Sequence, residues 1–284
     1  MKLTNSSRRS ALALMLGLSG AAMFNRKASA RIAYEFGIFP YLPALKLEHL
    51  FAPMAQSFSE VTNSPIQLRT KPTFEEFRDE LAQNAYDIAL LHPFFLIEAQ
   101  QHYGYVPIGR VDGQLTGVLL GCRDSHLHGI ASLRGKVLAL PPRLAGVSYL
   151  TIIALDEHGL TPGVDVELRH YRTKVSCLHA VATGDADGCV IPSFMVEQLD
   201  AVKRMNLVPI AETRGIPGLA LAASTRLERP LREQLKHHIL TWNNTVQGQG
   251  VLERVRWPRV VEAEPADYAM IGANHELLNK YAMR

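Results

Sequence analysis

The segment Tyr86-Asp87-Ile88-Ala89-Leu90-Leu91-His92-Pro93 combines a short apolar run with an abrupt stop. Four consecutive apolar residues after an aspartate predict a buried β-strand. The His92-Pro93 pair ends that strand, because proline has no N–H to give to a hydrogen-bond ladder. Residues 94–102 then predict a helix. A strand that leads directly into a helix is the unit from which open α/β sheets are built.

Strand-like and helix-like segments alternate in the same way along the chain. This alternation predicts parallel sheets covered by helices on both faces. Roughly 250 residues is long for one open sheet, so we expect two lobes. The expected strands span 32–38, 66–70, 86–91, 116–122, 136–140, 166–171, 186–191, 207–211 and 219–223. The expected helices span 44–61, 74–83 with a Thr73/Glu76 capping box, 94–102, 144–158, 174–183, 193–203, 230–243 and 265–281.

The first thirty residues have the pattern of an export signal. Lys2, Arg8 and Arg9 precede an apolar run from Ala11 to Phe24, and Ala28-Ser29-Ala30 resembles a cleavage site. Arg8-Arg9 suggests the twin-arginine route, with ordinary secretion and an uncleaved membrane anchor as alternatives. We therefore expect residues 1–30 to be a signal peptide and the protein to work outside the cytoplasm.

The basic surplus of the chain belongs to this signal. The 284 residues carry a formal charge of +3, with 30 basic and 27 acidic side chains. Removing the five basic residues of the signal leaves 25 basic side chains against 27 acidic ones, a net charge of −2. No cluster of lysine and arginine remains, so the charge pattern excludes nucleic acid as a partner.

Three segments together identify a family resemblance: Phe36-Gly37-Ile38-Phe39-Pro40-Tyr41, then Phe74-x-x-Phe77 before the 86–93 segment, then His179-Ala180-Val181-Ala182-x-Gly184-x-Ala186-Asp187. This set resembles the phosphonate- and phosphate-type periplasmic solute-binding proteins. The resemblance implies a type 2 periplasmic binding protein fold of class α/β, with two lobes joined by a two-strand hinge. It implies a periplasmic protein that is no enzyme and needs no cofactor.

The resemblance also implies a division of the chain and a ligand cleft. Residues 31–120 and 215–284 would form the first lobe, and residues 121–214 the second. The chain would cross between the lobes near 118–123 and return near 212–219, with a small-molecule ligand in the cleft. The ligand-binding residues carried over are Tyr41, His92, Leu144, Ala145 and Gly146.

The 144–146 segment departs from the family pattern of a hydroxyl-rich turn. Leu144 and Ala145 have no side-chain donors, whereas an oxyanion needs several. Arg143, Arg172 and Lys174 are the cations that could supply them, and Arg172 joins the candidate ligand-binding residues. Asp187 is a further candidate that could instead brace the fold.

Three cysteines in an exported chain leave one without a partner. Cys177, on the helix over 174–183, and Cys189, on the next strand, are the default disulfide pair in an oxidising compartment. Cys122 is left over at the expected first crossing, and a soft thiol favours a thiophilic solute such as arsenite. The segments 69–74 and 173–181 resemble the arsenite-sensing branch of the family, which implies that Cys122 binds the arsenic atom.

Two functions follow. The first is a periplasmic arsenite-binding protein that signals to a membrane sensor histidine kinase controlling arsenite oxidation. The alternative is the substrate-binding protein of an ABC transporter permease for phosphate, phosphite, phosphonate or a related oxyanion. Two further hypotheses are a metal site at Cys122, His126 and His128 and an enzyme with Cys122 as nucleophile and His92 or His170 as base.

Overall fold

The computed structural model describes residues 33–196 and 205–281. The expected signal peptide, 1–30, lies outside the described residues, as does most of the helix expected over 193–203. Within the described ranges, no helix is both long enough and apolar enough to cross a membrane.

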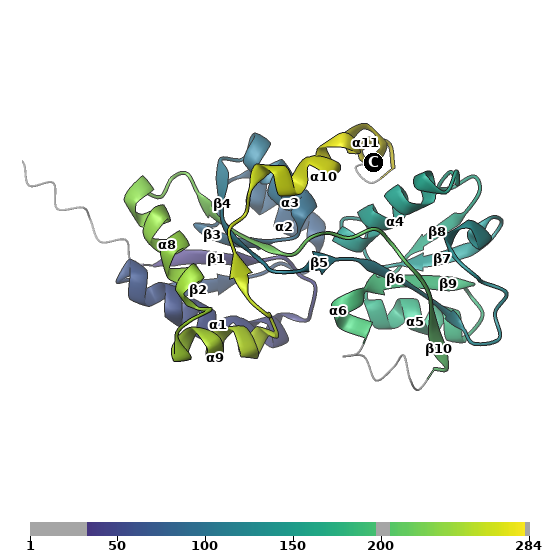
Figure 1. Ribbon diagram of the computed structural model, residues 1–284, viewed down its shortest axis with the longest axis horizontal. Coiled ribbons are helices and arrows are strands. Elements are labelled where there is room, and N and C mark those ends of the chain that lie inside the picture. The colour runs from purple at the N-terminus through teal and green to yellow at the C-terminus, as the bar shows by residue number, and fades with distance from the viewer. Residues whose placement is uncertain (1–32, 197–204, 282–284) are drawn as a thin grey trace, which may run out of the picture. The chain divides into compact units, whose positions relative to one another are not determined.

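The first lobe is built on a six-stranded sheet with the order β13-β4-β12-β3-β1-β2 (Figure 1). Strand β1 pairs in parallel with both β2 and β3, whereas β12 and β13 pair antiparallel with their neighbours. The expected parallel sheet is therefore a mixed one, with parallel pairs on both sides of β1 and antiparallel pairs on both sides of β12. The strands are β1 (Tyr34–Ile38), β2 (Ile66–Arg69), β3 (Ile88–Leu91), β4 (Tyr105–Val111), β12 (Ala220–Ser224) and β13 (Val260–Val261).

The second lobe is built on a five-stranded sheet with the order β10-β6-β9-β7-β8. Here β7 pairs in parallel with β8 and β9, and β6 pairs antiparallel with β9 and β10. The strands are β6 (Gly117–Cys122), β7 (Val137–Leu140), β8 (Glu167–His170), β9 (Gly188–Pro192) and β10 (Leu207–Glu212).

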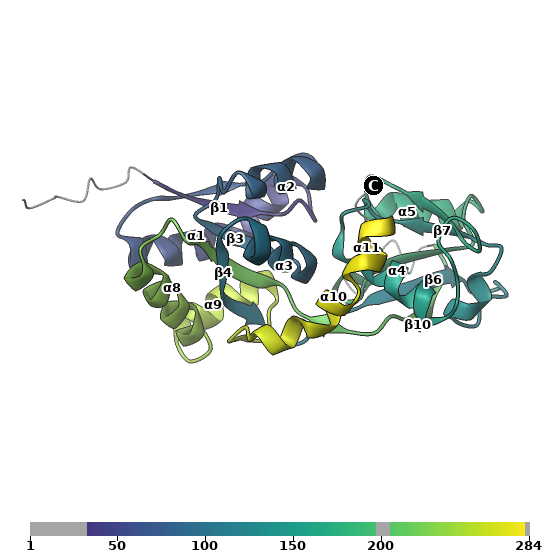
Figure 2. The same cartoon turned by 90° about the horizontal axis from the view of Figure 1, so that it is seen from above.

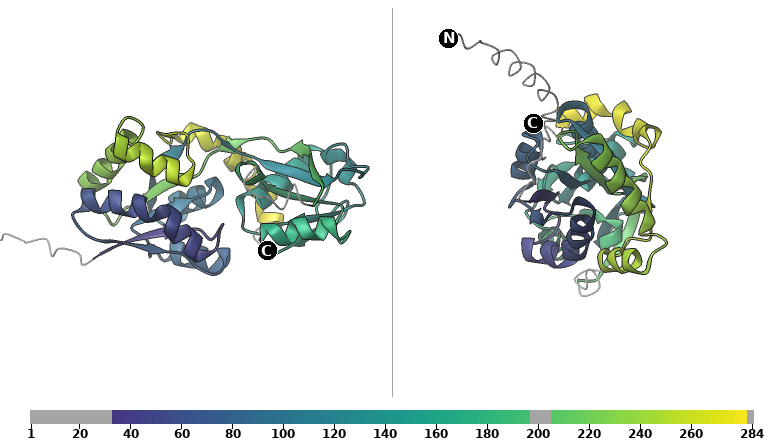
Figure 3. Two further views of the ribbon diagram at one scale, coloured as in Figure 1. Left: turned by 90° about the horizontal axis from the view of Figure 1, so that it is seen from below. Right: turned by 90° about the vertical axis from the view of Figure 1, so that its left-hand side faces the viewer.

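Helices cover the two sheets. In the first lobe α1 packs against α8 and α9, and α2 packs against α3; Figure 3 shows the purple α1 beside the green helices. In the second lobe α4 and α5 both contact β6 and β9. The helices are α1 (Ala44–Thr62), α2 (Phe74–Ala82), α3 (Pro93–His102), η1 (Ile130–Leu133), α4 (Gly146–Glu157), α5 (Lys174–Ala182), α6 (Ser193–Val196), α8 (Arg229–Thr241), α9 (Val246–Val255), η2 (Pro265–Tyr268), α10 (Ala269–Ala273) and α11 (His275–Tyr281).

Two short strands form the hinge between the sheets. The chain leaves the first sheet after β4, passes through β5 (Gln114–Leu115), and enters the second sheet at β6. It returns through β11 (Ile216–Pro217), which pairs antiparallel with β5. The sequence predicts the first crossing near residues 118–123, but the chain crosses a few residues earlier, at β5. The expected lobe boundary at residue 120 therefore falls inside β6.

The C-terminal helices span both lobes. Helix α10 contacts α3 of the first lobe, and α11 contacts α4 of the second. Figure 2 shows the yellow α10 and α11 running alongside α3 and α4. The described chain therefore connects the lobes at the hinge strands and again through this helical tail.

The two lobes share a β-α-β-α-β unit that is not visible as a sequence repeat. In the first unit Thr73 caps α2 by accepting a hydrogen bond from the Glu76 amide at 3.1 Å, and in the second Thr173 caps α5 through the Ser176 amide at 3.1 Å. In both units, each parallel strand ends at a loop that leads into the N-terminus of the next helix. In open α/β sheets, ligands bind outside these strand ends.

An aspartate directly precedes the third strand in each unit. Asp87 accepts a hydrogen bond from the Glu35 amide at 2.9 Å, and Asp187 accepts one from the Val137 amide at 2.8 Å. Asp187 also pairs with Lys136 at 3.2 Å. These contacts tie the third strand to the first, so Asp187 braces the second lobe.

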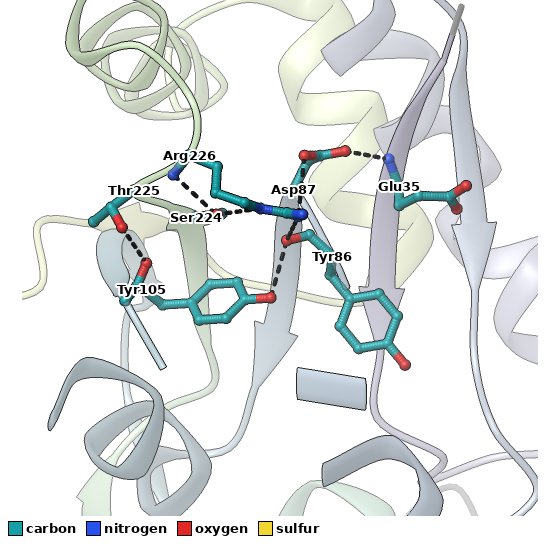
Figure 4. A network of polar contacts seen from close by, with 8 residues as sticks. Glu35, Tyr86, Asp87, Tyr105, Ser224, Thr225 and Arg226 are labelled. Atoms are coloured by element: carbon teal, nitrogen blue, oxygen red, sulfur yellow. Dashed lines mark hydrogen bonds and ion pairs between the residues drawn. The ribbon is translucent and has the colours of Figure 1, made fainter. Parts of the chain in front are cut away.

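Asp87 is the more deeply buried of the two, with a fully covered side chain. Its carboxylate also lies 3.5 Å from the Arg226 guanidinium, as Figure 4 shows. Arg226 in turn donates to the Tyr86 carbonyl at 3.3 Å, which also accepts the Tyr105 hydroxyl at 2.9 Å. The network joins β1, β3, β4 and the loop after β12.

Candidate functional site

A small cavity lies where helix starts and strand ends of both lobes converge. Its volume is about 30 Å³, and we call it the inner chamber. Most of its wall is apolar or aromatic, and its one charged side chain among the described residues is Lys174. The inner chamber is lined by Phe39, Tyr41, Phe74, His92, Leu115, Ala145, Gly146, Val147, Lys174, Pro192, Phe194 and Leu219.

His92 is part of the chamber wall, but its hydrogen bonds are already made. Its Nδ1 accepts from the Phe95 amide at 3.3 Å, so the proton of the neutral ring is on Nε2. That Nε2–H donates to the Leu144 carbonyl at 3.1 Å. Burial lowers the pKa of His92 to about 3, so the ring stays neutral. His92 therefore links α3 to the segment before α4 and has no donor left for a ligand.

The start of α4 brings backbone amides to the chamber. Ala145 is the residue before the first helical turn, and no side chain caps this helix. The first amides of an α-helix have no acceptor within the helix, and those of Gly146 and Val147 belong to chamber-lining residues. Such amides and the helix dipole favour negative charge. A side chain at position 146 would crowd Leu115, whose Cδ2 would be 3.2 Å from the added Cβ, and would touch the His92 ring.

Lys174 supplies the positive charge. It is the first residue of α5, placed there by the Thr173 cap. Its ammonium donates to the Tyr41 carbonyl at 2.8 Å and lies 6.0 Å from the centre of the Tyr41 ring. Among the described residues, no carboxylate lies within ion-pair distance of it. Burial lowers the pKa of Lys174 to about 8, so the amine of Lys174 is protonated in most molecules at neutral pH.

Tyr41, which also lines the chamber, carries a neutral hydroxyl. Its ring packs against Phe39 at 5.0 Å and Phe194 at 6.3 Å between centroids. Burial raises the pKa of the phenol, so it remains protonated. Within the part of the chain that the structure describes, the hydroxyl has no hydrogen-bond partner, which leaves it able to donate to a ligand.

The structure brings together some of the residues expected at the site. Tyr41, His92, Ala145 and Gly146 line the inner chamber, and Leu144 contributes its carbonyl to His92. Arg172 does not line it and has an exposed side chain. Lys174, two residues further on, is the cation that lines it. Phe74, which the sequence marked only as part of the family resemblance, and Phe194, which it did not single out, complete the aromatic wall.

Cys122 lies away from this chamber. It is the last residue of β6, which starts at the hinge and pairs at this end with Leu207 of β10. The half-buried thiol faces the Val181 carbonyl at 3.7 Å and packs with the core cluster that holds Cys177 and Cys189. The expectation that Cys122 sits at the crossing beside the cleft is wrong, because the crossing comes earlier.

The expected disulfide and the metal hypothesis also find no counterpart. Cys177 and Cys189 are both buried and both free. Burial raises the pKa of the Cys177 thiol to about 12, so it is an inert core thiol. Among residues 33–196 and 205–281, no group of three or more histidine, cysteine or acidic side chains is arranged to hold a metal ion, and Cys122, His126 and His128 do not form one.

Several solved structures with the same fold are those of solute-binding proteins, and one is the sensor domain of a histidine kinase, 17% identical, covering 82% of this chain and 99% of that chain with a TM-score of 0.58. PhnD1 from Prochlorococcus marinus, in complex with methylphosphonate, is 15% identical; the match covers 88% of this chain and 99% of that chain, with a TM-score of 0.76. A binding protein component of an ABC phosphonate transporter from Pseudomonas aeruginosa is 15% identical, covers 84% of each chain and has a TM-score of 0.71. The aliphatic sulphonate binding protein SsuA from Escherichia coli is 17% identical, covers 88% of this chain and 92% of that chain, and has a TM-score of 0.60.

These likenesses show the two-lobed α/β fold of type 2 binding proteins. No curated protein matches the sequence. The family model for the periplasmic substrate-binding protein of phosphonate ABC transporters matches residues 36–268. That match spans both sheets, the hinge and every residue of the inner chamber, and the chain therefore belongs to this family of periplasmic substrate-binding proteins.

Proposed function

We propose that the protein captures a small phosphonate- or phosphite-like oxyanion in the inner chamber and delivers it to an ABC transporter permease. The observation that carries the proposal is the Lys174 ammonium, which lies in the chamber with a carbonyl as its partner and, among the described residues, no carboxylate within ion-pair distance. A charge withdrawn from water in this way is costly unless an opposite charge compensates it. A bound oxyanion would supply that charge.

Three kinds of donor could share the anion. The Lys174 ammonium gives a charge-assisted hydrogen bond, the Gly146 and Val147 amides give backbone donors, and the Tyr41 hydroxyl gives a neutral one. These donors replace the hydroxyl-rich turn that the 144–146 segment lacks. The set comes from both lobes, so an anion held by all three would favour the arrangement in which the lobes approach each other.

The arsenite hypothesis has less support from the site. It rests on a thiol at the ligand, and Cys122 lies at the far end of β6 from the hinge. The family description supports a transporter as the membrane partner. We therefore propose an ABC permease, rather than a sensor histidine kinase, as that partner.

Isothermal titration calorimetry on the dialysed protein tests the proposal. Methylphosphonate, phosphite, phosphate, sulfate and arsenite are titrated separately at pH 7. We expect one phosphorus oxyanion to bind with a stoichiometry of one and arsenite to give no heat beyond dilution. Binding of arsenite alone, lost in Cys122→Ser, would reverse the choice between the two functions.

The affinity for the oxyanion should fall as the pH rises above 8. Burial lowers the pKa of Lys174 to about 8, so the empty chamber loses its positive charge above that value. The anion favours the ammonium form, so binding takes up a proton and the affinity falls by up to about tenfold per pH unit. Titrations of methylphosphonate from pH 7.0 to 9.5 measure this slope.

Lys174→Arg provides the matched control for this slope, because a guanidinium stays charged throughout the range. Ionisation of the ligand affects both proteins equally and cancels in the comparison. A Lys174→Arg protein that binds and shows the same slope as the wild type would contradict the assignment to Lys174.

A further inference from the structure

A second cavity adjoins the inner chamber. Its volume is about 250 Å³, and we call it the outer chamber. Four residues line both cavities: Tyr41, Leu115, Phe194 and Leu219. The two chambers therefore share part of their walls, including the Tyr41 and Phe194 rings, which meet edge to face at 6.3 Å.

The outer chamber has an apolar body. Leu42 contributes from the loop before α1, Leu50 from the second turn of α1 and Met195 from α6. Trp257 and Pro258 come from the loop after α9. Phe194 is 40% exposed, although most large apolar side chains of the described residues are buried. Apolar surface in a concave site favours an apolar ligand group, because that surface is withdrawn from water on binding.

The charges around the outer chamber favour a ligand of negative charge. Lys46, Arg254 and Arg256 line it, against the single carboxylate of Asp112. All three cations have exposed side chains, so they would attract an anion over a distance rather than bury its charge. Attraction toward the outer chamber leads an anion to the entrance of the inner one.

The inner chamber is too small for a substituted anion. With about 30 Å³, it has room for about two water-sized groups, so it can take oxygens of an acidic head group and no substituent besides. A substituent on that head group must lie elsewhere, and the neighbouring space is the outer chamber beyond Tyr41 and Phe194.

We infer that the ligand is an amphiphilic oxyanion: an acidic head group in the inner chamber with an apolar, preferably aromatic, substituent in the outer chamber. The inference rests on the proposed function for the head group and adds the class of the substituent. Tyr41 and Phe194 offer their rings to an aromatic group, for which edge and offset contacts are favourable.

The test compares phenylphosphonate with methylphosphonate by calorimetry on the full chain. Phenylphosphonate should bind at least tenfold more tightly. Leu42→Trp narrows the outer chamber. It should lower the affinity for phenylphosphonate at least tenfold and change the affinity for methylphosphonate less than twofold. Leu45→Trp places the same ring on α1 at a residue that is 78% exposed and does not line the chamber, and should change neither affinity.

Retained methylphosphonate binding shows that the Leu42→Trp protein is folded. Equal affinities of the wild type for the two anions, or an equal loss of both in Leu42→Trp, would overturn the inference and leave the proposed function standing. Failure of the wild type to bind any oxyanion would instead overturn the proposed function, and the inference with it.

Discussion

Replacing Lys174 by methionine should weaken the binding of methylphosphonate or phosphite by at least 100-fold. Methionine keeps an unbranched apolar stem of four heavy atoms but removes the ammonium, which is the only charged group of the inner chamber among the described residues. Removing one partner of a buried, hydrogen-bonded charge pair costs about 2–5 kcal/mol, and 100-fold corresponds to about 2.7 kcal/mol. Calorimetry at pH 7 measures the change.

Two variants serve as controls for this loss. Arg172→Met removes an exposed positive charge two residues away, so the change in net charge is the same but the chamber is untouched. Cys122→Ser tests the thiol at the far end of β6. Both should bind within twofold of the wild type. If Arg172→Met loses as much affinity as Lys174→Met, the anion is attracted by the overall electrostatic potential of the protein and not by direct contact with Lys174.

Local sequence signals predicted much of the secondary structure. The Thr73 cap and the apolar runs of β3, β7 and β9 depend on neighbouring residues alone. Strand β4 (Tyr105–Val111) was missed because Pro107 and Gly109 interrupt the pattern of a strand. Helix α9 (Val246–Val255) was missed because Gly248 and Gly250 lower its helix propensity.

Strand direction was beyond the reach of the sequence pattern. Strands β12 and β6 have the same apolar appearance as their parallel neighbours, but each runs antiparallel because the chain enters it from the other lobe. The direction of such a strand depends on where the chain crosses between the lobes. A hinge strand as short as β5 leaves no recognisable pattern in the sequence, so the crossing point could not be located from it. The same uncertainty explains why Cys122 was predicted at the hinge. An error of a few residues in the crossing point exchanges the start of β6, beside the hinge, for its far end.

The site was predictable where the fold alone positions it. Tyr41, His92 and Gly146 follow parallel strands, so their neighbourhood follows from the position of strand ends in an α/β sheet. The choice among Arg143, Arg172 and Lys174 was not predictable. Lys174 lines the chamber because the Thr173 cap makes it the first residue of α5, whereas Arg172 lies before the cap and is exposed.

Asp87 should matter far more to the stability of the protein than its counterpart Asp187. Both carboxylates accept a backbone amide of the first strand in their unit, at 2.9 and 2.8 Å. They differ in burial: the Asp87 side chain is fully covered, whereas that of Asp187 is 37% exposed, beside a Lys136 that is 40% exposed. Water can therefore replace the Asp187 carboxylate beside the Val137 amide and Lys136. It cannot replace the Asp87 carboxylate as readily, because that side chain is fully covered.

We expect Asp87→Ala to lower the free energy of unfolding by about 3 kcal/mol, because it removes a fully covered carboxylate that accepts from the Glu35 amide and faces Arg226. Asp187→Ala should cost about 1 kcal/mol. For a chain of this size, about 3 kcal/mol lowers the melting temperature by roughly 6–12 °C. Urea denaturation followed by circular dichroism measures both, and an unchanged m-value shows that the midpoints can be compared directly. Equal losses in the two variants would mean that burial of the Asp87 carboxylate does not decide its contribution, because exposure to water is the main difference between the two sites.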